Sequence, residues 1–144
     1  MHGSGKFTVS TASWSDDREV LQSLRRTVFV IEQKVPEGLE WDEADALSLH
    51  ALAQDNHGLP VGTGRLLPDG HVGRMAVLRE WRGQGAGSAL LEFLVRQARQ
   101  RGMHSLQLHA QIHAIGFYAR QGFVPRGGEF MEVGIPHRLM TLNW

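Results

Sequence analysis

Three glycines stand within five residues, at Gly83, Gly85 and Gly87, directly before an amphipathic segment. The apolar residues of this segment recur at helical spacing, at Leu91, Leu94, Val95 and Ala98. Gly102 follows them, where a helix cap is expected. The pattern therefore predicts a helix that begins in a glycine-rich turn. Such a turn presents unpaired N–H groups and the positive end of the helix dipole, which favour an anion and above all a pyrophosphate.

The residue types around the glycines separate the phosphate sites that such a turn can form. A P-loop ends in Gly-Lys-Ser or Gly-Lys-Thr, whereas this turn ends "GAGSA", so that site is excluded. A dinucleotide site needs an acidic residue at the end of the following strand, and the next candidate strand, "SLQLHAQ", has none. A tight turn that packs a helix on a strand without any ligand is the remaining alternative to an anion site.

The rest of the chain alternates between strand and helix patterns. Strands are predicted at Phe7–Ala12, Leu49–Gln54, Pro60–Leu67, His71–Leu78, Ser105–Ala110, Phe123–Arg126 and His137–Asn143. Besides the segment after the glycines, helices are predicted from Ser15 to about Glu32 and over His113–Gln121. The acidic stretch "QKVPEGLEWDEADALS" after the first helix predicts a loop or a short helical turn.

The order of these elements indicates the fold class. A meander of strands followed by strand, helix and strand is typical of an α/β fold on a mixed sheet. Between Val72 and Leu108 this order predicts a right-handed crossover and a parallel pair of strands. The glycine turn then lies at the C-terminal end of the first strand of that pair, where open α/β sheets bind their ligands.

Length and charge limit the function classes. The 144 residues suit a single domain that spans residues 1–144. Residues 1–5, "MHGSG", resemble an expression-tag remnant, and we expect them to be disordered or foreign to the fold. Fifteen basic residues balance fifteen acidic ones, so the chain lacks the net field that recruits nucleic acid or an anionic membrane. We therefore expect neither of them as a partner.

The absence of cysteine excludes a disulfide framework, a thiolate nucleophile and a cysteine-ligated metal. It fits a reducing compartment, and the sequence has neither a signal peptide nor an apolar run of about 18 residues, so we expect a cytoplasmic location. No metal is expected either. His109 and His113 are four residues apart, but a predicted strand-to-helix break separates them, and no His-Glu-x-x-His pattern occurs.

The glycine turn and a later segment together resemble a known family. "RGQGAG", from Arg82 to Gly87, matches the (Gln/Arg)-x-x-Gly-x-(Gly/Ala) signature of the GNAT superfamily, the GCN5-related N-acetyltransferases. "GRMAVLREWRGQGAGSALL" resembles the family's strand, turn and helix, and "AIGFYARQGFVPRG" resembles its later "A..FY...GF" segment. The resemblance runs from Leu49 to the C-terminus. "VFVIEQKVP", "WDEAD" and "GIPHRLM" further resemble the ElaA-like branch.

The resemblance implies an α/β (α+β) fold, with a mixed, mostly antiparallel sheet of six to seven strands flanked by helices on both faces. It also implies acetyl-coenzyme A as co-substrate, with the pyrophosphate on the glycine turn and the pantetheine arm along a strand edge. The implied coenzyme-binding residues are Met75, Ala76, Val77, Arg82, Gly83, Gln84, Gly85, Ala86, Gly87, Ser88, His113, Phe117 and Tyr118. His113 departs from the family pattern, because many relatives have asparagine there.

Tyr118, the only tyrosine in the chain, stands where the family protonates the sulfur of the leaving coenzyme. The resemblance implies an N-acetyltransferase that moves acetyl to a primary amine by direct attack in a ternary complex, with Tyr118 as general acid. A phenol with a pKa of about 10 can protonate a thiolate of similar basicity. The alternative for a tyrosine on a short helix is a packing role.

The sequence does not identify the general base. Some relatives carry a glutamate on the strand that reads "HVGRMAVL" here, and this chain has no carboxylate there. A water chain that ends at Glu32, His50, His109 or His137 is an alternative, since an imidazole is suited to proton transfer near neutral pH. Glu32 and His50 are the candidate bases, and Glu32, His109 and His137 are the candidate contacts to the acceptor. A solvated or core role is the alternative for each of them.

The expected partner is a small-molecule or peptide amine, and the chain is expected to act as a monomer or a homodimer. A non-catalytic acyl-coenzyme A binding or sensing module of the same fold is the alternative function. It would share the glycine turn, whereas only an enzyme needs Tyr118 and a base. A nucleic-acid-binding domain is disfavoured by the balanced charge.

Overall fold

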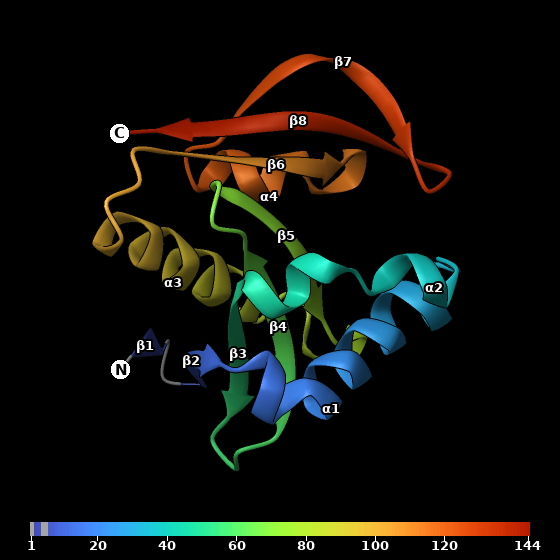
Figure 1. Ribbon diagram of the computed structural model, residues 1–144, viewed down its shortest axis with the longest axis vertical. Coiled ribbons are helices and arrows are strands. Elements are labelled where there is room, and N and C mark those ends of the chain that lie inside the picture. The colour runs from blue at the N-terminus through green and yellow to red at the C-terminus, as the bar shows by residue number, and fades with distance from the viewer. Residues whose placement is uncertain (1, 4–5) are drawn as a thin grey trace.

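An eight-stranded sheet runs through the part of the chain that the computed structural model describes, residues 2–3 and 6–144 (Figure 1). The strand order is β1-β2-β3-β4-β5-β6-β8-β7. The strands are β1 (His2–Gly3), β2 (Phe7–Ala12), β3 (Leu49–Asp55), β4 (Pro60–Leu66), β5 (His71–Val77), β6 (Ser105–Gln111), β7 (Val124–Glu132) and β8 (Ile135–Asn143). Only β5 and β6 are parallel among the described pairs. The predicted mixed, mostly antiparallel sheet is confirmed.

The N-terminal edge of the sheet includes part of the segment that we expected to stand outside the fold. His2–Gly3 form β1 and pair with β2. Residues 1, 4 and 5 of that segment lie outside the described residues.

Helices cover both faces of the sheet, as the resemblance implied. They are α1 (Trp14–Arg25), the π-helix η1 (Arg26–Glu32), α2 (Glu37–Glu40), the short 3-10 helices η2 (Glu43–Leu47), η3 (Arg79–Trp81) and η4 (Ile112–Ala114), α3 (Ala86–Gln100) and α4 (Ile115–Arg120). On one face α3 packs so closely on β4 that a side chain at Gly62 or Gly64 would meet its leucines. On the other face, Val28 and Phe29 of η1 pack on Ala76 of β5. No helix in this described part is long and apolar enough to cross a membrane.

The first predicted helix is confirmed in extent, but its second half is wound as a π-helix. The N–H of Gln33 donates to the carbonyl of Val28 at 3.1 Å, the five-residue spacing of that helix type. The η1 segment has seven residues, too few for sequence periodicity to distinguish the two windings. The helix ends at Glu32, and Glu32 and Gln33 both line the large cleft beside β5.

The C-terminal hairpin is longer than the sequence predicted. β7 continues to Glu132 instead of ending near Arg126, and β8 begins at Ile135 instead of His137. The register of the pair shifts between Arg126 and Phe130. β7 therefore continues through Gly127 and Gly128, and its pairing with β8 resumes at Phe130 in a shifted register.

β5 and β6 separate after only two paired positions. The parallel pairs are His71 with Gln107 and Val72 with Leu108. Just beyond them, Arg74 adopts a positive φ of 50° and the register of β5 against β4 shifts, which marks a β-bulge. A bulge bends its strand, and Figure 1 shows β5 running away from β6. The later part of β5 therefore has a free edge where β6 would have continued the ladder.

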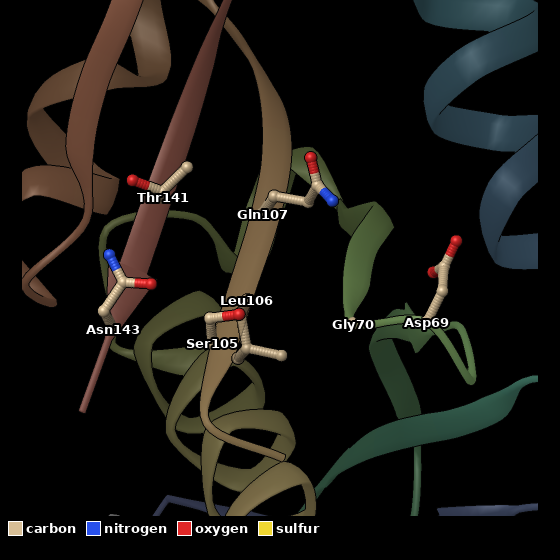
Figure 2. Close-up of a pocket in the computed structure, with 7 residues that line it drawn as sticks. All are labelled: Asp69, Gly70, Ser105, Leu106, Gln107, Thr141 and Asn143. Carbon is tan, nitrogen blue, oxygen red and sulfur yellow. The ribbon is translucent and has the colours of Figure 1, made fainter.

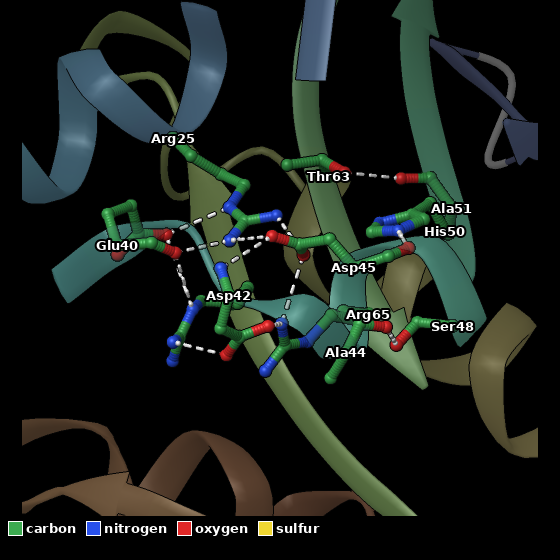
Figure 3. Close-up of polar contacts among 11 residues, drawn as sticks. Arg25, Glu40, Asp42, Ala44, Asp45, Ser48, His50, Ala51, Thr63 and Arg65 are labelled. Carbon is green, nitrogen blue, oxygen red and sulfur yellow. Dashed lines mark hydrogen bonds and ion pairs between the residues drawn. The ribbon is translucent and has the colours of Figure 1, made fainter. Parts of the chain in front are cut away.

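A buried ion network fastens α1 to the segment that follows η1 (Figure 3). Arg25 is 1% exposed, and its guanidinium donates to Glu40 Oε1 at 2.8 Å and to Asp45 Oδ1 at 2.7 Å. The indole rings of Trp14 and Trp41 lie 5.4 and 5.1 Å from the guanidinium carbon. A buried charge is tolerated when it is paired and hydrogen-bonded in this way. The network therefore fixes the position of α2 and η2 against α1.

We predict that Asp45→Asn lowers the free energy of unfolding by about 3 to 5 kcal/mol, because it removes the carboxylate that Arg25 and Arg65 share. Burial acts to raise the pKa of Asp45, but the hydrogen bond and charge of Arg25 outweigh it, so the pKa lies below its usual range and the carboxylate is charged at pH 7. Urea unfolding measures the change. Asp16→Asn, at an exposed position on α1, is the matched control and should cost less than about 1 kcal/mol. Equal losses in both variants would contradict the role of the network.

Candidate active site

A cleft of about 780 Å³ opens where β5 and β6 separate. Its walls come from η1, β5, β6, α4 and the turn between β7 and β8. Eight residues singled out from the sequence line it: Glu32, Met75, Val77, Arg82, His109, His113, Tyr118 and His137. A smaller hollow of about 140 Å³ lies at the other end of the strand pair, beside Gly70 and Ser105 (Figure 2). The larger cleft is therefore the candidate active site.

Two glycines of the turn before α3 are required by backbone conformation. Gly83 and Gly85 have φ values of 75° and 99°, in the left-handed region that side chains disfavour. A Cβ at Gly83 would meet no protein atom within 4 Å, so packing alone does not explain this glycine. The turn leads directly into α3, whose first N–H groups have no partner within the helix. This geometry suits an anion, as the sequence predicted.

The third glycine of the turn is required by a close approach. A Cβ at Gly87 would lie 3.3 Å from the ring of Phe117 and 3.8 Å from a methyl group of Val77. Gly87 therefore lets α3 pack tightly on α4 and on the end of β5. Of the neighbouring residues, Ala86 is the buried first residue of α3, Ser88 is half-buried and Gln84 is exposed.

Arg82 ties the turn to the opposite wall of the cleft. Its Nη atoms donate to both carboxylate oxygens of Glu32 at 2.6 and 2.8 Å, and its Nε donates to the carbonyl of Val77 at 2.9 Å. The hydrogen bond from Arg82 holds the pKa of Glu32 below its usual range. Glu32 therefore lines the cleft as a charged group whose two oxygens already accept hydrogen bonds.

Tyr118 is half-buried in the wall that α4 contributes. Its ring packs edge-on against Phe117 and Phe123, with centroid distances of 5.0 and 6.1 Å. Burial raises the pKa of Tyr118 to about 12. The phenol is therefore neutral at pH 7 and carries a proton that it can donate.

The cleft joins two chemically different faces of the sheet. Tyr118 packs against the apolar core that surrounds α3, which also buries Leu108 and Ala110 of β6. The alternating residues of β6 therefore point to the opposite face, among them Gln111. Gln111 pairs across the ladder with His137, so the two share that face.

A carboxylate flanked by two imidazoles occupies the face opposite to Tyr118. His109 Nδ1 lies 2.8 Å from Glu132 Oε1, and His137 Nε2 lies 3.6 Å from Glu132 Oε2. All three residues line the cleft. Among the described residues, no group of histidine, aspartate and glutamate side chains is arranged to hold a metal ion.

Several predicted residues do not line the cleft. Those of the glycine turn after Arg82, together with Phe117, lie beside it, whereas His50 and Ala76 pack elsewhere. His50 is 1% exposed, its Nε2 lies 2.8 Å from the carbonyl of Asp45, and its ring stacks on Trp14. Burial lowers the pKa of His50, so this imidazole is a neutral part of the packing beside the ion network. Ala76 lies on the predicted strand edge, but its side chain points away from α3 and packs on η1.

Most of the other residues that line the cleft were not singled out from the sequence, among them Glu132 and Gln33. Glu132 lies beyond the predicted end of its strand, and the alternation of Phe130 and Glu132 was the signal that could have extended it. Gln33 exchanges amide hydrogen bonds with Gln111 at 3.2 and 2.9 Å and so bridges η1 and β6. Nothing in the sequence near Gln33 indicated a partner 78 positions away.

The separated strands, the glycine turn at a helix N-terminus and the cleft between them define the acyl-coenzyme A acyltransferase class of α/β proteins. Residues 16–144 match the family model described as the acetyltransferase (GNAT) domain. The chain belongs to this GNAT acetyltransferase family, and it is an acyl-coenzyme A N-acyltransferase by that membership. Its family implies an acyl-coenzyme A co-substrate and an amine acceptor.

Individual relatives agree with this assignment. A Bacillus subtilis protein provisionally named an acetyltransferase is 40% identical over 141 residues, which are 94% of this chain and 95% of its own length. The crystal structure of an acyl-CoA N-acyltransferase from Pseudomonas aeruginosa has a TM-score of 0.82 and 30% identity, and the match covers 94% of this chain and 99% of that one. ElaA of Escherichia coli has a TM-score of 0.83 and 27% identity over 95% and 99% of the two chains. The resemblance to the ElaA-like branch is thereby confirmed.

We predict that the folded protein titrates its only tyrosine at a pH of about 12, because burial of Tyr118 disfavours the phenolate. In denaturant the midpoint should return to about 10. The folded pKa is the higher one, so the folded state should lose stability as the pH rises from the unfolded value through the folded one. The phenolate absorbance measures both midpoints, and Tyr118→Phe serves as the blank. A folded midpoint near the ordinary value would contradict the burial of the hydroxyl.

Proposed function

We propose that the protein transfers the acetyl group of acetyl-coenzyme A to a primary amine by direct attack in a ternary complex, with Tyr118 as general acid. One observation carries this proposal: the cleft between β5 and β6 is lined both by Tyr118 and by Arg82, the residue that begins the glycine turn. Both features are needed to bind an acyl donor and to protonate its leaving group. The acceptor can reach the same cleft from the other face of the sheet.

The residues of the turn fit the phosphates of the coenzyme. The positive φ values of Gly83 and Gly85 and the N-terminus of α3 together offer backbone N–H groups to an anion. The free edge of β5 at Met75 and Val77 would hold the amide groups of the pantetheine arm, as an added strand does. Bound acetyl-coenzyme A supplies the activated acyl group. His113 and Phe117 flank this path on η4 and α4.

Tyr118 would donate its proton toward the leaving sulfur. Its raised pKa keeps the phenol protonated throughout the physiological range. The same shift makes complete proton transfer less favourable than from an exposed tyrosine, so the proton moves only as negative charge develops on the sulfur. The chain has no cysteine, which supports direct transfer without a covalent thioester on the enzyme.

Fewer candidate bases and acceptor contacts remain than the sequence offered. Glu32 is bound to Arg82, and His50 packs outside the cleft. His109 and His137 are the candidate histidines that do line the cleft, and their imidazoles could receive a proton that leaves the amine. These contacts support an acceptor site on the face of the sheet that carries η1.

We predict that Gly83→Ala weakens the binding of coenzyme A at least tenfold, because alanine disfavours the φ of 75° that aims the N–H groups of the turn. Calorimetric titration with coenzyme A measures the affinity. Gly58→Ala is the matched control, because this glycine has a φ of 80° in the remote β3–β4 hairpin and is equally unobstructed. The proposed donor site would be refuted by equal affinities in the two variants. It would also be refuted if the wild-type protein bound no coenzyme A at millimolar concentration.

We predict that Tyr118→Phe lowers kcat at least tenfold while the affinity for coenzyme A stays within twofold, because only the hydroxyl is removed. Release of free thiol from acetyl-coenzyme A across a panel of primary amines measures turnover. Unchanged turnover would remove Tyr118 from the mechanism. Coenzyme binding by the wild-type protein without thiol release on any amine would instead support a non-catalytic acyl-coenzyme A sensor.

A further inference from the structure

We propose that Glu132 and His137 form the acceptor subsite of the cleft and bind the ammonium group of an aliphatic amine. This inference rests on the proposed function, since it names the residues that would receive the acceptor of that reaction. It depends on three features of the cleft: which carboxylates are already neutralised, how the imidazole of His137 is oriented, and where the apolar wall lies.

Glu132 differs from the other carboxylates of the cleft in its partners. Three carboxylates line the cleft within the described residues: Glu32, Glu40 and Glu132. Glu32 is paired with Arg82, and Glu40 is paired with Arg25. Within the described part of the chain, Glu132 forms ion pairs with imidazoles only, at His109 and His137. An imidazole can be neutral at pH 7, whereas a guanidinium is always charged. Glu132 is therefore the cleft carboxylate with the most negative charge left for a cationic ligand.

The arginines of the cleft do not compete for Glu132, because each of them is engaged elsewhere. Arg65 donates to Asp42 and Asp45 at 2.8 and 3.0 Å. Arg74 pairs with Asp42 at 3.2 Å and with Glu40 at 3.4 Å. The arginines are thus neutralised on one side of the cleft, and Glu132, which no arginine pairs with among the described residues, lies on the other. This separation favours an ammonium group next to Glu132.

The orientation of the neutral His137 ring places two hydrogen-bond acceptors opposite each other, Nε2 of His137 and Oε2 of Glu132. His137 Nδ1 lies 2.7 Å from the carbonyl of Ile135, so Nδ1 must carry the hydrogen of that bond. In the neutral ring the lone pair is then on Nε2, which lies 3.6 Å from Glu132 Oε2. This distance exceeds that of a hydrogen bond. The side chain of His137 is almost fully buried, so little water is available to satisfy Nε2. An ammonium group has three donors and no acceptor, and it satisfies both atoms at once.

The surroundings of the pair suit an alkyl chain. Val28, Phe29 and Val35 form an apolar cluster against which Ile135 packs, and all four residues line the cleft. Ile135 is two residues from His137 on β8, so the apolar wall begins beside the polar pair. His109 donates to Glu132 on the side away from His137 and so holds the carboxylate in place. The ligand class is therefore a primary amine on an aliphatic stem.

The test measures amine binding directly, with butylamine as the cationic probe and 1-butanol as its uncharged counterpart. NMR titration of the full chain gives the affinity of each probe. We expect Glu132→Gln to weaken butylamine binding at least tenfold and to leave the affinity for 1-butanol unchanged. Glu129→Gln is the matched control, because Glu129 is an exposed glutamate on the same strand. It should bind butylamine as the wild-type protein does.

A second variant separates the two members of the pair. His137→Asn keeps a donor for the carbonyl of Ile135 but removes Nε2, the atom that faces Glu132. We expect this variant to bind butylamine about fivefold more weakly than the wild-type protein does. Thermal unfolding confirms that each variant is folded. The inference is overturned if Glu132→Gln binds butylamine as tightly as the wild-type protein does. It is equally overturned if the wild-type protein does not prefer butylamine to 1-butanol.

Turnover is a separate readout, so the inference and the proposed function can fail independently. If Glu132→Gln loses butylamine binding but the wild-type protein releases no thiol with any amine, the subsite stands and the enzymatic proposal fails. If the wild-type protein acetylates amines and Glu132→Gln has an unchanged KM for them, the enzymatic proposal stands and the subsite is wrong.

Discussion

The short parallel pairing of β5 and β6 is the constraint on which the rest of this structure depends. The two strands share only two paired positions, because the bulge at Arg74 bends β5 away from its neighbour. Their separation interrupts the sheet at its centre and leaves backbone groups of β5 without a ladder partner. It also creates a cleft that reaches both faces of the sheet. A continuous sheet would have kept the two faces apart.

The bulge is held by the same buried charges that position the helices. A positive φ at a residue with a side chain is costly, and it persists only where the surroundings fix it. Arg74 pairs with Asp42 and Glu40, and Glu40 also accepts from the buried Arg25. Burial raises the pKa of Glu40, while the guanidinium of Arg25 opposes that shift. The ion network thus links the packing of α1 to the opening between β5 and β6.

The sequence predicted those parts of the fold and of the site that local patterns determine. The helix after the glycine turn follows from its apolar spacing, and the conformations of Gly83 and Gly85 follow from the lack of a side chain. The winding of η1 and the length of β7 did not follow, because both depend on contacts with distant strands. The same limit applies to the site. Tyr118 belongs to a local motif, whereas Glu132 meets His109 only through the register of three strands.

The two faces of the sheet differ in charge, although the chain has no net charge. This difference suits two dissimilar substrates. The face of α3 buries apolar side chains around Tyr118 and keeps its phenol neutral. The opposite face carries Arg65, Arg74 and Glu132, whose side chains are held in place by Asp45, Asp42 and His109 respectively. In the proposed reaction the phenol of Tyr118 must carry its proton on one side, and on the other side the acceptor binds as an ammonium ion and loses a proton before its nitrogen attacks. The two environments meet at the opening between β5 and β6. In the proposed reaction each substrate therefore reaches the point of transfer from its own face of the sheet.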